Sequence, residues 1–155
     1  MTSRLQRVLR EEKGLVYSVE CRATSLPDIG TVDFDVSVRS EKIIEVAEIL
    51  LNEIQAFVLD GVDEEELKLV KQRYGYDLDY ELDDPYKQIV RYGFCHLYSS
   101  ECTVEEERKR IFQVTRMDIL RVAREIFIPQ KLNFILVGPY TSEVKKTFEK
   151  LVQDF

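Results

Sequence analysis

The clearest structural signal in this sequence is the segment Val32-Asp-Phe-Asp-Val-Ser-Val38. Its apolar residues alternate strictly with polar ones, which predicts a strand with one buried and one wet side. Such alternation is typical of an antiparallel sheet that leaves one face uncovered. Residues 15–24, rich in β-branched and aromatic side chains, predict a second strand just before it. The turn between them contains Pro27 and Gly30, so the two segments form a hairpin.

Helical patterns surround this hairpin. An amphipathic helix is expected over residues 2–12, and a block of five helices is expected to begin near residues 40, 63, 85, 103 and 115. A short apolar strand at 132–137 and a closing helix over 141–153 complete the chain. The order α-β-β-α5-β-α predicts an α+β fold, an antiparallel sheet with one face covered by helices, in a single partial domain spanning residues 1–155.

Three strands form a thin sheet for so many helices, and the chain opens directly in a helix. We therefore expect a domain truncated at its N-terminus, lacking an opening strand and helix. An uncovered sheet edge carries unpaired backbone donors and acceptors, so we also expect self-association.

Composition narrows the class of protein. Net charge is −7, from 29 acidic and 22 basic residues, which argues against nucleic acid as a partner, although modest acidity also simply favours solubility. The apolar runs are too short to cross a membrane, and no signal region precedes the first helix. Cysteines are odd in number and irregular in spacing, so reduced thiols and a cytoplasmic location are expected.

The residues that bind metals in proteins are scarce. Cys21, Cys95, Cys102 and His96 could in principle form a zinc site, but Cys95 and His96 are adjacent and no C-x-x-C pair exists. His-x-x-Glu-His and its inverse need two histidines, and this chain has one. We therefore expect no metal ligands in this chain.

Two acidic clusters, Glu64–Glu66 and Glu105–Glu107, could suggest paired carboxylates. Each lies in the first turn of an expected helix, where its charge complements the helix dipole without any chemistry. A tyrosine-rich stretch that contains Tyr74, Tyr76 and Tyr80 could contact peptides, but partial burial between helices is favoured.

One stretch carries a family signature: Ser3-Arg-Leu-Gln-Arg-Val-Leu-Arg-Glu-Glu-Lys-Gly-Leu-Val-Tyr-Ser18. It resembles the second half of pitrilysin/insulinase-type zinc metallopeptidases, the family that includes the mitochondrial processing peptidases. Residues 61–68, 114–124 and 132–139 resemble further family segments in the family's order. Gln6 and Asp63 depart from the pattern, which commonly has an aromatic residue and a threonine at these positions.

The resemblance implies a division of labour. In this family the first half carries His-x-x-Glu-His and binds zinc, whereas the second half has no metal ligands. Zinc is therefore expected in a partner half or subunit, and this chain alone is expected to be inactive. Arg10 and Tyr17 match an Arg and a Tyr that reach the scissile peptide. A guanidinium can hold a carbonyl or carboxylate, and a phenol can donate to an oxyanion.

A structural alternative exists for both residues. Arg10 could complement the carboxyl end of its helix, and Tyr17 could pack in the sheet, since regular alternation places it on the same face as Val19 and Cys21. The residues alone favour this alternative, and the resemblance favours contact with a peptide substrate. Glu20, Asp33 and Asp35 on the wet face would line the same chamber.

The sequence allows two other functions besides a substrate-binding half of a zinc endopeptidase. Some family relatives are non-proteolytic scaffolds, so this chain could be an interaction subunit of the same fold. A self-contained hydrolase would have to pair Cys95 or Cys102 with His96.

Overall fold

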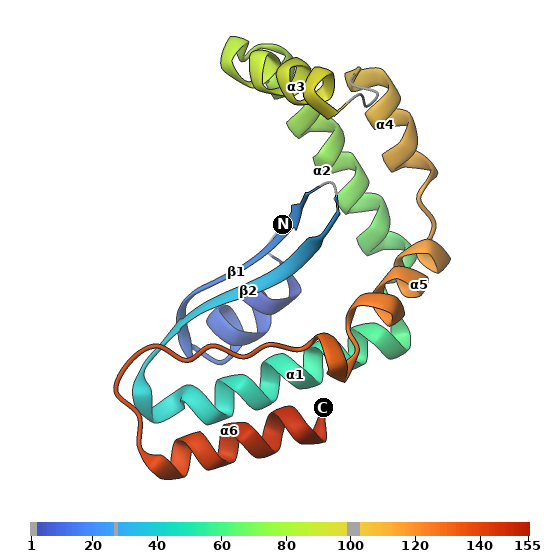
Figure 1. Ribbon diagram of the computed structural model, residues 1–155. Coiled ribbons are helices and arrows are strands. Elements are labelled where there is room, and N and C mark those ends of the chain that lie inside the picture. Colours follow the sequence, from blue (N-terminus) through green and yellow to red (C-terminus); the bar gives the residue numbers. More distant parts are fainter. Residues whose placement is uncertain (1–2, 27, 99–102) are drawn as a thin grey trace. The chain divides into compact units, whose positions relative to one another are not determined.

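The computed structural model describes residues 3–26, 28–98 and 103–155 (Figure 1). The chain folds into two compact units. The first contains Met1–Leu59 and Arg124–Phe155, and the second contains Asp60–Ala123. The expectation of a single domain spanning 1–155 remains a prediction.

The first unit contains a two-stranded antiparallel sheet (Figure 1). The strands are β1, Val16–Ser25, and β2, Gly30–Val38, preceded by the short helix η1, Gln6–Glu12. The apolar side of the hairpin packs on η1 and on α1, Ile43–Asp60, which follows the single turn η2, Ser40–Lys42. This core contains the following buried residues: Leu9, Leu15, Val16, Val19 and Val46. The expected antiparallel sheet with helices on one face is confirmed.

The C-terminal part of the chain completes the first unit. It comprises the single turn η3, Pro129–Lys131, and the helix α6, Ser142–Asp154. Phe127 lies close to two aromatic rings, with ring centroids 6.1 Å from Phe34 in β2 and 6.3 Å from Phe57 in α1. Aromatic contacts therefore link the sheet, α1 and the segment after α5.

The prediction of a third strand over residues 132–137 is wrong. The segment is an extended stretch between η3 and α6 (Figure 1), and its residues alternate between half-buried and exposed. Phe134 packs on Phe148 of α6, with ring centroids 4.6 Å apart. However, the sheet contains only β1 and β2 among the described residues, so this segment is not a strand. Apolar alternation brings the side chains into the core, but a strand also needs a hydrogen-bonded partner.

Three helices make up most of the second unit: α2, Glu64–Leu82, α3, Pro85–Tyr98, and α4, Val104–Gln113. The helix α5, Arg116–Ile126, begins in this unit. The helix starts expected near residues 63 and 103 are confirmed, and each has a capping side chain. Asp63 accepts a hydrogen bond from the Glu66 amide at 2.7 Å, and Thr103 forms a capping box with Glu106.

A polar cluster links α2, α3 and α4, and it centres on Glu107. The Glu107 carboxylate accepts hydrogen bonds from Tyr74 and Arg91, and Arg91 also contacts Glu81 at 2.7 Å. Burial raises the pKa of Glu107, but the hydrogen bonds from Arg91 and Tyr74 outweigh it, so this pKa lies below its usual value. Burial and the bond to Glu107 raise the pKa of Tyr74 to about 12. Glu107 therefore has a second role besides complementing the dipole of its helix.

Candidate functional site

A β-bulge at Tyr17 shapes the candidate site. Val16 pairs with Val38 and Ser18 pairs with Ser37, so Tyr17 has no partner in β2. An unpaired extra residue bends a strand and re-aims its side chain. Accordingly, Tyr17 is 86% exposed while Val16 and Val19 are both buried.

The bulge corrects the expectation drawn from regular alternation. Alternation placed Tyr17 on the inner face with Val19, but the register shift between Val16 and Ser18 breaks it. Tyr17 therefore does not pack in the core of the sheet. Its side chain is accessible to another molecule, as a substrate contact requires.

Arg10 lies in the last turn of η1 and is also exposed. Its position matches the structural alternative, in which a cation complements the carboxyl end of the helix. It is equally compatible with contact to a peptide, because no ion pair holds the guanidinium among the described residues. Gly14, with φ of +59°, then turns the chain from η1 into β1. Arg10 and Tyr17 thus lie in one compact unit, on either side of this turn.

The three carboxylates predicted for the wet face share one side of the hairpin. Glu20 pairs with Asp35, and Asp33 pairs with Arg22. Arg22 contacts Glu20 and lies 3.8 Å from Asp35. Sequence reasoning missed Arg22, although its spacing of two from Glu20 places it on the same face. One guanidinium against three carboxylates leaves this face acidic, but less so than expected.

A shallow hollow of about 440 Å³ opens beside Tyr17. Its lining comes from the start of β1 and the end of β2 and contains the following residues: Gly14, Leu15, Val16, Tyr17, Ser37, Val38 and Arg39. Leu15 and Val16 are buried and contribute apolar surface, whereas Arg39 is exposed. Arg39 was also missed by the sequence reading, because it lies just past the alternating segment, where no pattern marks it.

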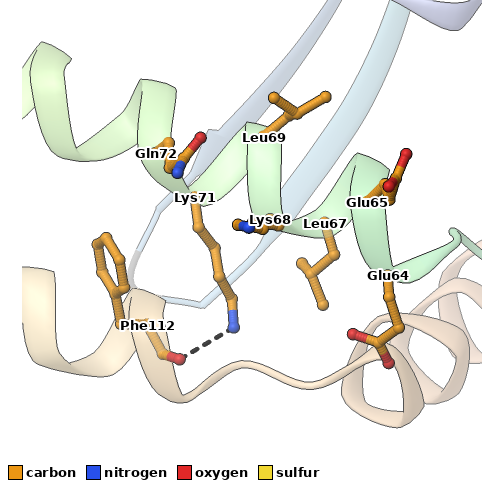
Figure 2. Close-up of a pocket in the computed structure, with 8 residues that line it drawn as sticks. All are labelled: Glu64, Glu65, Leu67, Lys68, Leu69, Lys71, Gln72 and Phe112. Atoms are coloured by element: carbon orange, nitrogen blue, oxygen red, sulfur yellow. Dashed lines mark hydrogen bonds between the residues drawn. The ribbon is translucent and has the colours of Figure 1, made fainter.

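A larger hollow of about 710 Å³ lies in the second unit, between α2 and α4 (Figure 2). Glu64, Glu65, Lys68 and Lys71 line it with charges of both signs, around Leu67 and Phe112. Figure 2 shows Lys71 donating to the carbonyl oxygen of Phe112 at 2.9 Å. This lysine satisfies a carbonyl at the end of α4, which is a structural role. The hollow beside Tyr17 is the better candidate because it contains a predicted site residue.

The described residues contain no group of three or more His, Cys, Asp or Glu side chains that could hold a metal ion. Cys21 is a free thiol, and Cys102 lies outside the described residues. Burial, and then the charge of Asp33, raise the pKa of Cys21, which disfavours a reactive thiolate. None of the helices in the described parts is long and apolar enough to cross a membrane.

Comparison with known proteins identifies the relatives of this chain. Residues 1–74 match the family described as the peptidase M16 inactive domain. Proteins named as uncharacterised zinc proteases in Mycobacterium tuberculosis and Mycobacterium bovis are each 26% identical over 92% of this chain and 33% of their own length. One from Streptomyces coelicolor is 27% identical over 90% of this chain and 30% of its own length.

The chain thus spans about a third of the length of the curated relatives that it matches. The family match contains both Arg10 and Tyr17. Together with the α+β hairpin and its helical cover, these matches confirm the resemblance to the C-terminal, inactive half of the pitrilysin-type M16 zinc metallopeptidases.

Proposed function

We propose that this chain is the substrate-binding half of a zinc-dependent endopeptidase that degrades or processes peptides. The observation that carries the proposal is the bulge, which leaves Tyr17 86% exposed and accessible to substrate. Zinc and its ligands would be supplied by an N-terminal half or a partner subunit.

Arg10 and Tyr17 would act on the substrate and not on the metal. The guanidinium of Arg10 would hold a peptide carbonyl or a substrate carboxylate, and the phenol of Tyr17 would donate to the oxyanion that develops at the scissile bond. The acidic side of the hairpin, with Glu20, Asp33 and Asp35, would favour basic peptides. The free thiol at Cys21 supports a reducing, cytoplasmic location.

Substitution of both residues in the assembled enzyme tests this proposal. Arg10→Ala and Tyr17→Phe should each lower kcat/KM about a hundredfold, since loss of one oxyanion donor costs roughly 3 kcal/mol. Arg10→Lys should rescue only in part, because an ammonium lacks the two-pronged contact of a guanidinium. Steady-state kinetics with matched zinc analysis would measure both effects, and zinc content should not change.

Arg7→Ala is the matched control, because Arg7 lies on the same helix and its side chain forms an exposed ion pair with Glu12 at 3.5 Å. It should leave cleavage unchanged. If Arg10→Ala and Tyr17→Phe also leave cleavage unchanged, the two residues are structural. The second candidate, a non-proteolytic scaffold subunit, would then replace this one.

A further inference from the structure

The hollow beside Tyr17 has an unusual charge balance for so acidic a chain. Among the described residues that line it, Arg39 is the only one with a charged side chain, and none carries a carboxylate. The guanidinium of Arg39 has no ion pair or hydrogen bond with any described residue. A cation with no internal partner, at the rim of an apolar hollow, is free to bind an anion.

The backbone places Arg39 and Tyr17 at the same end of the hairpin. Arg39 follows Val38, which pairs with Val16, and Tyr17 follows Val16. The Arg39 carbonyl accepts a hydrogen bond from the Lys42 amide at 2.9 Å, which fixes the chain where β2 passes into η2. The two side chains, one from β1 and one from the residue that follows β2, therefore line one hollow.

The lining chemistry points to one kind of ligand. Leu15, Val16 and Val38 supply apolar surface, whereas Arg39, Tyr17 and Ser37 supply polar groups. Binding sites commonly combine an apolar surface with a few convergent polar groups. A C-terminal residue presents an apolar side chain and a carboxylate on one Cα, and Arg binds carboxylates through two parallel hydrogen bonds.

We propose that Arg39 binds the C-terminal carboxylate of a peptide that ends in an apolar residue, with that residue in the hollow beside Tyr17. This inference rests on the proposed function and deepens it, because it names a peptide group, a free carboxyl terminus, that the same chain would recognise. It differs from the acidic side of the hairpin, which would contact basic side chains of the same peptide.

The test compares three fluorescent peptides that bind the full 155-residue chain, followed by anisotropy. One ends in leucine with a free carboxylate, the second has the same sequence with a C-terminal amide, and the third is amidated and carries an internal glutamate. The free acid should bind about tenfold more tightly than either amide, the difference expected for one charge-assisted contact. Arg39→Gln should abolish this preference, Arg39→Lys should retain part of it, and the control Arg7→Gln should keep it.

Equal binding of all three peptides, or no binding of any, would overturn the inference. So would a preference for the internal glutamate or one that survives in Arg39→Gln. The peptidase role is judged separately, by the cleavage rates of Arg10→Ala and Tyr17→Phe. A carboxylate preference lost in Arg39→Gln, with cleavage unaffected in those two variants, would sustain the Arg39 site and refute the peptidase role.

Discussion

The Glu107 carboxylate stabilises the fold through contacts with two helices besides its own. Arg91, whose side chain is only 14% exposed, shares its guanidinium between Glu107 and Glu81. Charge-assisted bonds of this kind are stronger than neutral ones. Removal of one partner leaves the other charge partly buried and uncompensated. The loss in the free energy of unfolding therefore exceeds the net stabilisation that the pair provides.

Glu107→Gln should therefore lower the free energy of unfolding by about 1–3 kcal/mol at neutral pH. The matched control is Glu105→Gln, an exposed position in the first turn of the same helix. It should cost only a few tenths of a kcal/mol, through the helix dipole. Urea denaturation of both variants measures the difference. Equal losses in the two variants would mean that the cluster contributes nothing specific.

The Glu107 carboxylate also predicts how the stability of the protein changes in acid. The pKa of Glu107 in the folded protein lies below its ordinary value of 4.5, so the unfolded chain binds the proton more readily. Stability from Glu107 is therefore fully present above about pH 4.5 and is lost as pH falls through the folded pKa. Melting temperatures on an acid titration should fall less steeply in Glu107→Gln than in the wild type. Parallel curves for the two proteins would contradict this.

At the scale of the elements, Gly14 joins η1 to β1 with φ of +59°. An added Cβ there would meet no atom within 4 Å, so the whole cost of Gly14→Ala is conformational, about 1–2 kcal/mol. Gly93, inside α3, is also open, but an alanine there improves helix propensity. Gly93→Ala should stabilise the protein by about 0.5–1 kcal/mol. Thermal unfolding of the two variants should shift in opposite directions, and shifts of the same sign would refute this account.

The elements also show which features the sequence could predict. Helix starts at Asp63, Thr103 and Thr115 were predictable, because a capping residue and its partner lie three residues apart. The hairpin was predictable because alternation reports burial directly. Strand pairing is non-local, so the apolar pattern of 132–137 could not reveal that this segment has no ladder partner.

The candidate site was predictable only in part. Family resemblance located Arg10 and Tyr17, and alternation located Glu20, Asp33 and Asp35 on one face. Exposure of Tyr17 could not be foreseen, since a bulge is an irregularity of register between two strands. Arg39 could not be predicted either, because the hollow that it lines is formed by the two strands together.

At the scale of the whole molecule, we propose self-association because unpaired backbone groups can pair with a second copy. The segment 132–137 has strand-like alternation and two highly exposed side chains, Ile135 at 84% and Val137 at 90%. Strand addition by a second copy would satisfy its free backbone groups. Light scattering at high micromolar concentration should therefore show dimers or larger species, and Ile135→Lys should restore the monomer, because an edge lysine opposes pairing.

The matched control for self-association is Ile89→Lys in α3, a helix in which no residue is buried and Ile89 is 72% exposed. This variant should associate like the wild type. Dissociation by Ile89→Lys but not by Ile135→Lys would place the contact on α3. A clean wild-type monomer would refute self-association altogether.

The proposed division of labour places the zinc in the other half of the enzyme and not in this chain. A catalytic zinc takes three protein ligands and keeps a fourth position open, but this chain has His96 as its single histidine. The described residues offer no cluster of three candidate ligands either. The purified chain, equilibrated with zinc and then desalted, should therefore retain far less than one metal ion per chain and cleave no peptide.

Addition of the proposed zinc-bearing half should produce cleavage without placing metal in this chain. His96→Ala provides the control, because metal content and cleavage in the assembled protein should be unchanged by it. Metal analysis by mass spectrometry, before and after assembly, measures both. One tightly held zinc in the isolated chain, lost in His96→Ala, would show that this half binds metal itself, and zinc chemistry could then no longer be assigned to the partner alone.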